Sequence, residues 1–270
     1  MKFNEFKKFI LTHESLTAGE VALYLPELDD LYSIYSAARK QRSVAILEFG
    51  SGWSTLALAK ALKENFDSFG NNYLAEIRHP NPFKLMSVDC SKTFQKLAIE
   101  RLGSDLRSLV VPVQSSAYLA EYQGAIVSFY ENLPQFTADF IYLDGPDCDQ
   151  VGGSIRGFDL HFGSINHTYG LPMAADLVPL EAFLWSGTTI YTDGRGANAQ
   201  FLKRQFKRNW KYHYDAKIDQ HILKLREKPW GNITSRHNLI KHPFKYWLFK
   251  LFSRILLTRK ITPAIENPYL

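Results

Sequence analysis

Short apolar runs alternate with segments of helical periodicity through the middle of the chain. The apolar runs cover residues 44–49, 84–88, 108–113, 138–143 and 188–192, and the helical segments cover 54–66, 94–102, 173–185 and 197–210. This alternation predicts parallel strands joined by crossover helices. Residues 211–214 and 221–225 are expected to close the sheet as an antiparallel pair. We therefore expect an α/β fold with a doubly wound, mostly parallel seven-stranded sheet.

The two ends of the chain differ from this alternating centre. Residues 1–42 have a polar, amphipathic pattern that predicts an N-terminal helical cap, and residues 229–270 form a basic, aromatic and amphipathic tail. Residues 43–228 are then the α/β domain. Two long loops are expected within it, at 67–83 and 145–171, and loops of that length in a compact domain are usually functional.

Composition and charge limit the classes of protein to which the chain can belong. Hydrophobic residues make up 46% of the chain and charged residues 22%, as in a folded protein. The net charge of +5 comes from the tail, because residues 230–270 hold seven Lys and Arg but one Glu. A nearly neutral body argues against nucleic-acid binding. The N-terminus has no signal-peptide pattern, and Cys90 and Cys148 suggest no disulfide framework, so we expect a cytoplasmic location.

A glycine loop follows the first predicted strand, in the segment Glu48-Phe49-Gly50-Ser51-Gly52-Trp53-Ser54-Thr55. Gly50 and Gly52 permit a tight turn, and the loop opens into a helix whose free N–H groups attract an anionic group. A dinucleotide site needs a small residue where Thr55 stands, which argues against NAD. The segment instead resembles the first motif of class I methyltransferases, with Ser54 in place of the last glycine, and especially the catechol-O-methyltransferase-like branch.

That resemblance implies a Rossmann-like methyltransferase fold and S-adenosylmethionine as cofactor. It implies a cofactor-binding role for Glu48, Gly50, Ser51, Gly52 and Ser54. Asp89, at the end of the second strand, matches the family's ribose-binding acid, and Cys90 follows it. Ser115 and Ser116, after the third strand, match the loop that meets the adenine, although a plain loop is equally compatible with them.

The fourth strand ends in Asp144-Gly145-Pro146-Asp147, which resembles the fourth motif of the same family. Asp144 is expected at the junction of cofactor and substrate, and Asp147 at the start of the substrate loop. Two routes to acceptor deprotonation stay open. Asp144 and Asp193 could hold a divalent metal, with Asn198 as a neighbouring oxygen donor. Alternatively a general base could come from the long loop, where the candidates are Asp147, Asp159, His161 and His167.

Apolar residues of the tail recur at helical spacing between residues 241 and 260, with basic residues among them. This pattern fits a helix on an anionic membrane surface, such as the inner face of a membrane. It equally fits a helix docked on the body or in a self-association interface.

Together these features predict an S-adenosylmethionine-dependent methyltransferase of class EC 2.1.1 that O-methylates a small molecule or glycan. Two alternatives remain open at this stage. One is a non-catalytic binding protein with the methyltransferase fold, and the other is an NAD-dependent oxidoreductase.

Overall fold

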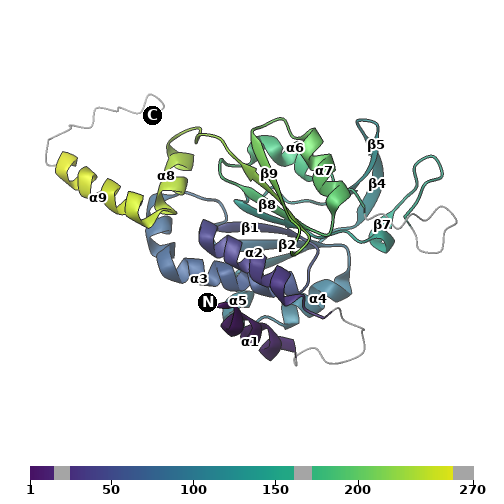
Figure 1. The fold of residues 1–270 in the computed structure, drawn as a ribbon, viewed down its shortest axis with the longest axis horizontal. Coiled ribbons are helices and arrows are strands. Elements are labelled where there is room, and N and C mark those ends of the chain that lie inside the picture. The colour runs from purple at the N-terminus through teal and green to yellow at the C-terminus, as the bar shows by residue number, and fades with distance from the viewer. Residues whose placement is uncertain (15–24, 161–171, 258–270) are drawn as a thin grey trace, which may run out of the picture.

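A computed structural model describes residues 1–14, 25–160 and 172–257. Within these ranges the main sheet has seven strands (Figure 1). Their spatial order is β3 (Val110–Gln114), β2 (Lys84–Asp89), β1 (Ala45–Phe49), β6 (Phe140–Leu143), β8 (Thr189–Asp193), β10 (Gln220–Leu225) and β9 (Trp210–Asp215). The first five run parallel, while β10 pairs antiparallel with both β8 and β9. The expected doubly wound, mostly parallel sheet is confirmed.

Helices cover both faces of this sheet. In Figure 1, α1 (Phe3–Glu14), α2 (Leu28–Gln41), α3 (Trp53–Glu76), α4 (Lys92–Glu100) and α5 (Ser104–Arg107) lie on one side, and α6 (Leu177–Leu180) and α7 (Gly196–Gln205) lie on the other. Every residue of β1 and β6 is buried between these layers. The continuous apolar runs of the sequence are therefore central strands covered on both faces, as expected of a parallel sheet.

The helix after β1 is longer than the sequence suggested. The expected loop at 67–83 is wrong for its first ten residues, because α3 continues to Glu76. Phe69 and Tyr73 lie one helical turn apart, and both are buried in the core. Gly70 weakens the helical pattern, but a β-carbon there would lie 2.5 Å from the ring of Phe66. Close packing against Phe66 therefore explains why glycine occupies this position, although its presence in the sequence argued against a continuous helix.

A second, smaller sheet lies beside the main one and was not anticipated. It consists of β5 (Ala125–Tyr130), β4 (Ala117–Tyr122) and β7 (Val151–Gly152) in that order (Figure 1). Gln123 and Gly124 connect β4 to β5 with φ of 51° and 79°, as a tight hairpin turn requires. The short β7 and the 3-10 helix Cys148–Gln150 give part of the predicted loop 145–171 regular structure.

Two predicted helices after the fourth strand are shorter than expected. Residues 173–185 do not form one helix. Within this range, α6 and the 3-10 turn Glu181–Phe183 are the helical parts. Pro179 within α6 has no N–H to continue a helical ladder. The helix expected at 197–210 ends at Gln205, and Trp210 already belongs to β9.

The predicted N-terminal cap packs directly onto the α/β core. Phe6 of α1 and Tyr35 of α2 are fully buried, with ring centroids 4.9 Å apart. Asn65 of α3 donates from its side-chain amide to the backbone oxygens of Ala38 and Ser43. The division at residue 42 remains a prediction, but these contacts make α1 and α2 part of the same hydrophobic core.

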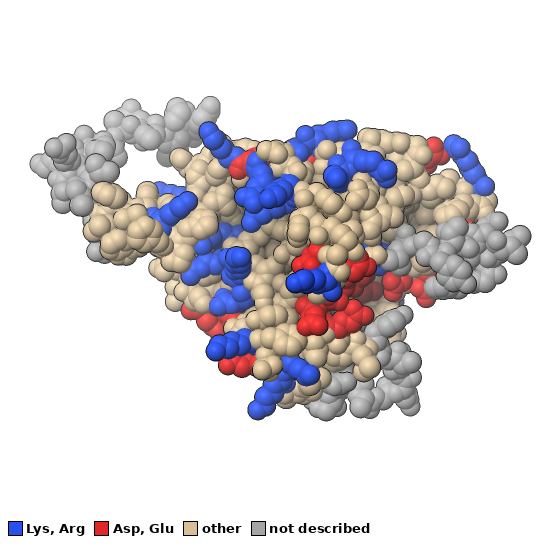
Figure 2. Space-filling view, viewed as in Figure 1, with Lys and Arg blue, Asp and Glu red and all other residues tan. Residues whose placement is uncertain are grey.

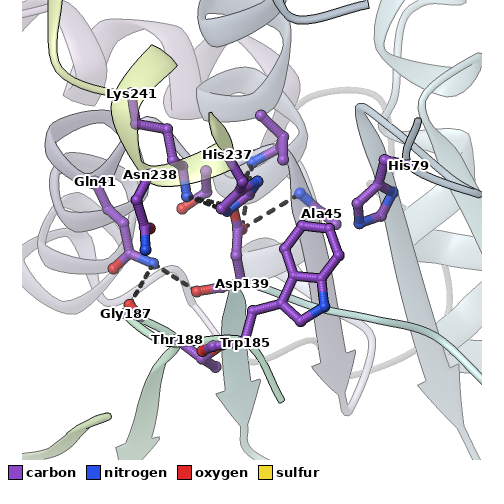
Figure 3. Close-up of polar contacts among 12 residues, drawn as sticks. Gln41, Ala45, His79, Asp139, Trp185, Gly187, Thr188, His237, Asn238 and Lys241 are labelled. Carbon is purple, nitrogen blue, oxygen red and sulfur yellow. Dashed lines mark hydrogen bonds and ion pairs between the residues drawn. The ribbon is translucent and has the colours of Figure 1, made fainter. Parts of the chain in front are cut away.

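The tail begins with α8 (Asn232–Ile240), which is fixed to the amino-terminal end of β6 by a buried polar cluster (Figure 3). Lys241 forms a buried ion pair with Asp139, the residue before β6. His237 of α8 lies 3.4 Å from the same carboxylate, which also accepts the backbone N–H groups of Val44 and Ala45. The body of the protein therefore extends to Lys241.

Candidate functional site

A cavity of about 400 Å³ opens at the carboxyl ends of β1, β2, β6 and β8. In parallel α/β sheets this is the edge where ligands bind. Its lining includes residues from the loop after β1, from the strand ends and from the segment around α2. The lining residues are Leu25, Glu27, Asp30, Leu31, Gly50, Ser51, Gly52, Trp53, Ser54, Asp89, Phe94, Leu97, Arg101, Tyr142, Asp144, Gly145, Asp147, Gln150 and Asp193.

The loops after β1 and β6 approach each other closely at two glycines. Gly50 has a φ of +90°, and a β-carbon on it would lie 2.8 Å from the backbone oxygen of Asp144. A β-carbon on Gly145 would lie 2.8 Å from the backbone nitrogen of Gly50. Both positions therefore require glycine, and the first and fourth motifs form one continuous wall of the cavity.

Gly52 places the start of α3 at the cavity. It is the N-cap residue, has no side chain to cap the helix, and a β-carbon there would meet open space. The Gly52 N–H donates to Thr55 Oγ1 at 3.1 Å, and that hydroxyl donates to Glu48 Oε2 at 2.7 Å. The first turn of a 24-residue helix thus faces the cavity, where its N–H groups and dipole favour an anionic ligand group.

Glu48 lies beneath the loop and does not line the cavity. It is fully buried, and its Oε2 also accepts the Ser87 hydroxyl at 2.6 Å. The Ser87 hydroxyl in turn lies 2.8 Å from the Ser51 hydroxyl. Burial raises the pKa of Glu48 to about 7. The structure therefore corrects the direct contact expected of Glu48, which positions the glycine loop from below.

Asp89 does reach the cavity, where it also organises the loops around it. Its carboxylate accepts the backbone N–H groups of Ser51 and Ser91. Burial raises its pKa, against the effect of these hydrogen bonds. A carboxylate has about four acceptor positions, so Asp89 retains capacity for two ligand hydroxyls.

Asp144 and Asp147 share one buried arginine. The Arg195 guanidinium donates to the backbone oxygens of Pro146 and Asp144 at 3.0 and 2.9 Å. It lies 3.5 Å from the Asp144 carboxylate and 3.4 Å from that of Asp147. The Arg195 guanidinium therefore bonds to the protein itself and holds the loop after β6.

The environment of Asp144 makes its carboxylate a candidate proton acceptor. About half of the side chain is open to the cavity (46%). Burial in the floor of the site raises the pKa of Asp144 to about 7, with Asp193 and Asp147 adding to the rise and Arg195 opposing it. Burial also raises the pKa of Asp147. A group with a pKa near neutrality suits general acid–base chemistry.

A second acidic group surrounds Asp193 at the cavity. The carboxylates of Glu27, Asp30 and Asp193 lie within 4.8 Å of one another, and this group does not include Asp144. Burial is the largest cause of the raised pKa values of Asp30, to about 7, and Asp193, to about 6. The Tyr142 hydroxyl donates to Asp193 at 3.4 Å. The expected metal pair of Asp144 and Asp193 lines one cavity, but metal binding stays a prediction.

Several predicted residues lie away from the cavity. Cys90, Ser115 and Ser116 are not among its lining residues. Ser115 is buried, and its hydroxyl accepts the Asn132 N–H at 2.9 Å. Asn198 is buried and bonds both backbone groups of Ala174 at 2.9 and 3.0 Å, so its amide is not a metal ligand here. His161 and His167 lie outside the described residues.

Other lining residues were missed by the sequence analysis. Arg101 lies over the ring of Trp53, 4.0 Å from its centroid, and both border the cavity beside Phe94 and Leu97. Leu25, Glu27 and Asp30 come from the segment taken as a separate cap. No local motif marks these positions, because their contact with the cavity depends on how α2 packs against the body.

Acidic side chains dominate the electrostatics of this site. Six carboxylates line the cavity, and among the described lining residues Arg101 is the one cation. Figure 2 shows Asp and Glu gathered near the centre of this face, although the chain as a whole has a net charge of +5. Such a site disfavours anionic ligands and favours neutral or cationic ones.

No family model matches the sequence, and no curated protein matches it. The structure is similar to the O-methyltransferase TomG from Streptomyces achromogenes in complex with SAM (13% identity, 84% of this chain and 100% of that chain, TM-score 0.40). It is also similar to the O-methyltransferase from Bacillus cereus in complex with SAH (13% identity, 84% of this chain and 92% of that chain, TM-score 0.41). A methyltransferase from Geobacter sulfurreducens matches at 12% identity over 82% of this chain and 90% of that chain, with a TM-score of 0.44.

These three proteins are described as methyltransferases, the family that the motifs resemble.

Proposed function

We propose that the protein is an S-adenosylmethionine-dependent O-methyltransferase acting on a hydroxylated small molecule or glycan of neutral or positive charge. The observation that carries the proposal is one cavity that brings together Gly50–Gly52, Asp89 and Asp144 from three strand ends. These are the positions at which the sequence resembles the methyltransferase motifs.

The donor set of the cavity fits the cofactor. The start of α3 at Gly52 suits the carboxylate of the methionine part, and Asp89 has acceptor capacity for two ribose hydroxyls. When bound, S-adenosylmethionine supplies an electrophilic methyl group on a positively charged sulfur. The surrounding carboxylates suit that charge. Thr55, which opposed NAD binding in the sequence, is buried and held by Glu48.

Asp144 is the proposed general base. Its carboxylate takes the proton from the acceptor hydroxyl, and a pKa of about 7 lets it do so near neutral pH. Arg195 donates hydrogen bonds to backbone oxygens of the loop that contains Asp144 and Asp147, and so holds that loop in place. The glycan and small-molecule classes both remain within this proposal, whereas acceptors that carry carboxylate or phosphate groups are disfavoured by the acidic lining.

Titration calorimetry with S-adenosylhomocysteine tests cofactor binding. We expect the wild-type protein to bind it, and Asp89→Asn to weaken binding at least about tenfold, since hydrogen bonds to a charged group contribute about 1.5–3 kcal/mol. Asp67→Asn, an equal charge change on the exposed side of α3, is the matched control. Absence of binding at millimolar ligand, or displacement by NAD, would overturn the proposal.

Release of S-adenosylhomocysteine separates an enzyme from a binding protein. The acceptor panel consists of amino alcohols, catechols, neutral sugars and carboxylated phenols. Turnover with neutral or cationic members is expected. Cofactor binding without turnover on any hydroxylated acceptor favours the non-catalytic alternative.

A further inference from the structure

The last described helix, α9 (Pro243–Leu257), extends from a firmly anchored base. His237 and Ile240 of α8 are buried, and Lys241 is held by its ion pair with Asp139. Beyond this point α9 projects from the body, as Figure 1 shows. Its orientation relative to the body is therefore set at its first turn.

The side of α9 that faces the body is polar. Tyr246 is half-buried and donates from its hydroxyl to Glu76 Oε1 at 3.2 Å. Lys250, one turn further on, forms an ion pair with the same carboxylate at the end of α3. These two contacts direct the Tyr246–Lys250 side of the helix toward α3.

The opposite side of α9 is apolar and exposed. Phe244 is 70% exposed, and Trp247 and Phe252 are each 57% exposed. Phe249 and Leu251 are also exposed. A helix docked on its own body turns its apolar side inward, whereas α9 does the reverse. Among the described residues, the body therefore does not cover the apolar side of α9, and an exposed patch of this kind indicates an external apolar partner.

The charge of the tail identifies the partner. Residues 230–270 carry seven Lys and Arg and one Glu. Lys241 is paired with Asp139, and Arg236 and Lys250 are paired with Glu76, whereas Lys245 is exposed on α9 and has no acidic partner among the described residues. In a two-fold dimer the same basic helix would face its own copy, which places like charges together. An anionic lipid surface offers both a hydrocarbon layer for the aromatic residues and negative headgroups for the lysines.

We propose that α9 lies in the surface of an anionic membrane, with Phe244, Trp247 and Phe252 inserted and Lys245 at the headgroups, so that the protein binds membranes peripherally. No helix among the described residues has the length and apolar character needed to span a bilayer. A 15-residue helix that lies flat in the interface fits that finding. This inference does not depend on the proposed activity.

Co-sedimentation of the full chain with vesicles tests this proposal. One set contains phosphatidylcholine alone, and the other contains phosphatidylcholine with about one third phosphatidylserine. We expect binding to the anionic vesicles that weakens at high salt, as screening of exposed charges requires. Trp247→Ser/Phe252→Ser should lower binding at least about tenfold, because each buried apolar side chain contributes strongly to partition.

Phe183→Ser/Ile233→Ser is the matched control, since these apolar residues are comparably exposed elsewhere on the surface. It should bind like the wild type. Lys245→Glu should also reduce binding about tenfold or more. Equal sedimentation with neutral and anionic vesicles, or no sedimentation at all, would overturn the proposal. A dimer in analytical ultracentrifugation that Trp247→Ser/Phe252→Ser abolishes, without lipid binding, would assign the patch to a second copy instead.

Discussion

Two aspartates at opposite ends of the short strand β6 have opposite chemistry. Asp139, before the strand, is buried, and burial alone would raise its pKa. Lys241 and His237 outweigh that effect and hold the pKa of Asp139 well below its ordinary value. Asp144, after the strand, shares a single arginine with Asp147 and has a pKa raised to about 7. Burial acts to raise the pKa of both carboxylates, so the cationic partners decide which of them stays ionised and which has a pKa near neutrality.

Removal of the cation beside Asp139 has the largest expected effect. Lys241→Met leaves a buried carboxylate without its ion-pair partner, which costs about 3–5 kcal/mol of the free energy of unfolding. Chemical denaturation measures the loss. The double variant Asp139→Asn/Lys241→Met should recover part of it, since both charges are then gone.

Lys96→Met provides the matched control for that experiment, because the Lys96–Glu100 pair is exposed. An exposed pair contributes at most about 1 kcal/mol. If Lys241→Met costs no more than Lys96→Met, the structural role assigned to the Asp139 end of β6 is incorrect.

Substitution of Asp144, the residue after β6, tests its proposed role as general base. For the best acceptor of the panel, Asp144→Asn should lower kcat/KM about 100-fold or more, which is the usual contribution of a general base. The wild-type rate should rise with pH and level off above about 7, because the proposed base accepts a proton only when its carboxyl group is deprotonated. The variant should lose that rise but keep its stability. A pH profile with an unchanged midpoint near 7 would assign the base to another group.

Glu48, a fully buried acid on the neighbouring strand β1, gives the smallest expected effect. Its pKa is raised from an ordinary 4.5 to about 7, so the folded state prefers the protonated form. The stability that this supplies is complete below about pH 4.5 and is lost as the pH rises toward 7. Between pH 5.5 and 7.5 the contribution falls by about 2 kcal/mol, because the slope is at most about 1.4 kcal/mol per pH unit and flattens near pH 7.

Thermal or chemical unfolding across that pH range measures the loss. Glu48→Gln should show a correspondingly flatter dependence, whereas Glu100→Gln on the exposed side of α4 should behave as the wild type. Identical pH dependence of Glu48→Gln and the wild type would mean that Glu48 is ionised throughout.

The strands and the strand-end residues could be predicted because their signals are local. The central strands are short, mostly apolar runs, and Gly50, Asp89 and Asp144 follow such runs directly. The β4–β5 hairpin was missed because its strands are only half-buried, although Gln123-Gly124 between two alternating runs was a turn signal. The long α3 was missed because Gly70 interrupts its pattern.

The rest of the site depends on contacts between segments distant in the chain. Arg195 is buried under the loop after β6, which lies about 50 residues before it in the sequence. No rule of residue spacing predicts that contact. Glu27 and Asp30 reach Asp193 only because α2 packs on α3. Periodicity describes how a segment buries its own apolar side, and it contains no information about which remote segment completes a cavity.

The contact between Gly50 and Gly145 limits how the site can vary. Where the two loops meet, the width of the cavity is set by main-chain atoms, so no change of side chain can widen it. The shape of the cavity can instead be changed at side chains in its lining, such as Leu25, Phe94 and Leu97. Substitutions that aim to change which ligand the cavity accepts should be confined to such side chains, with both glycines left untouched.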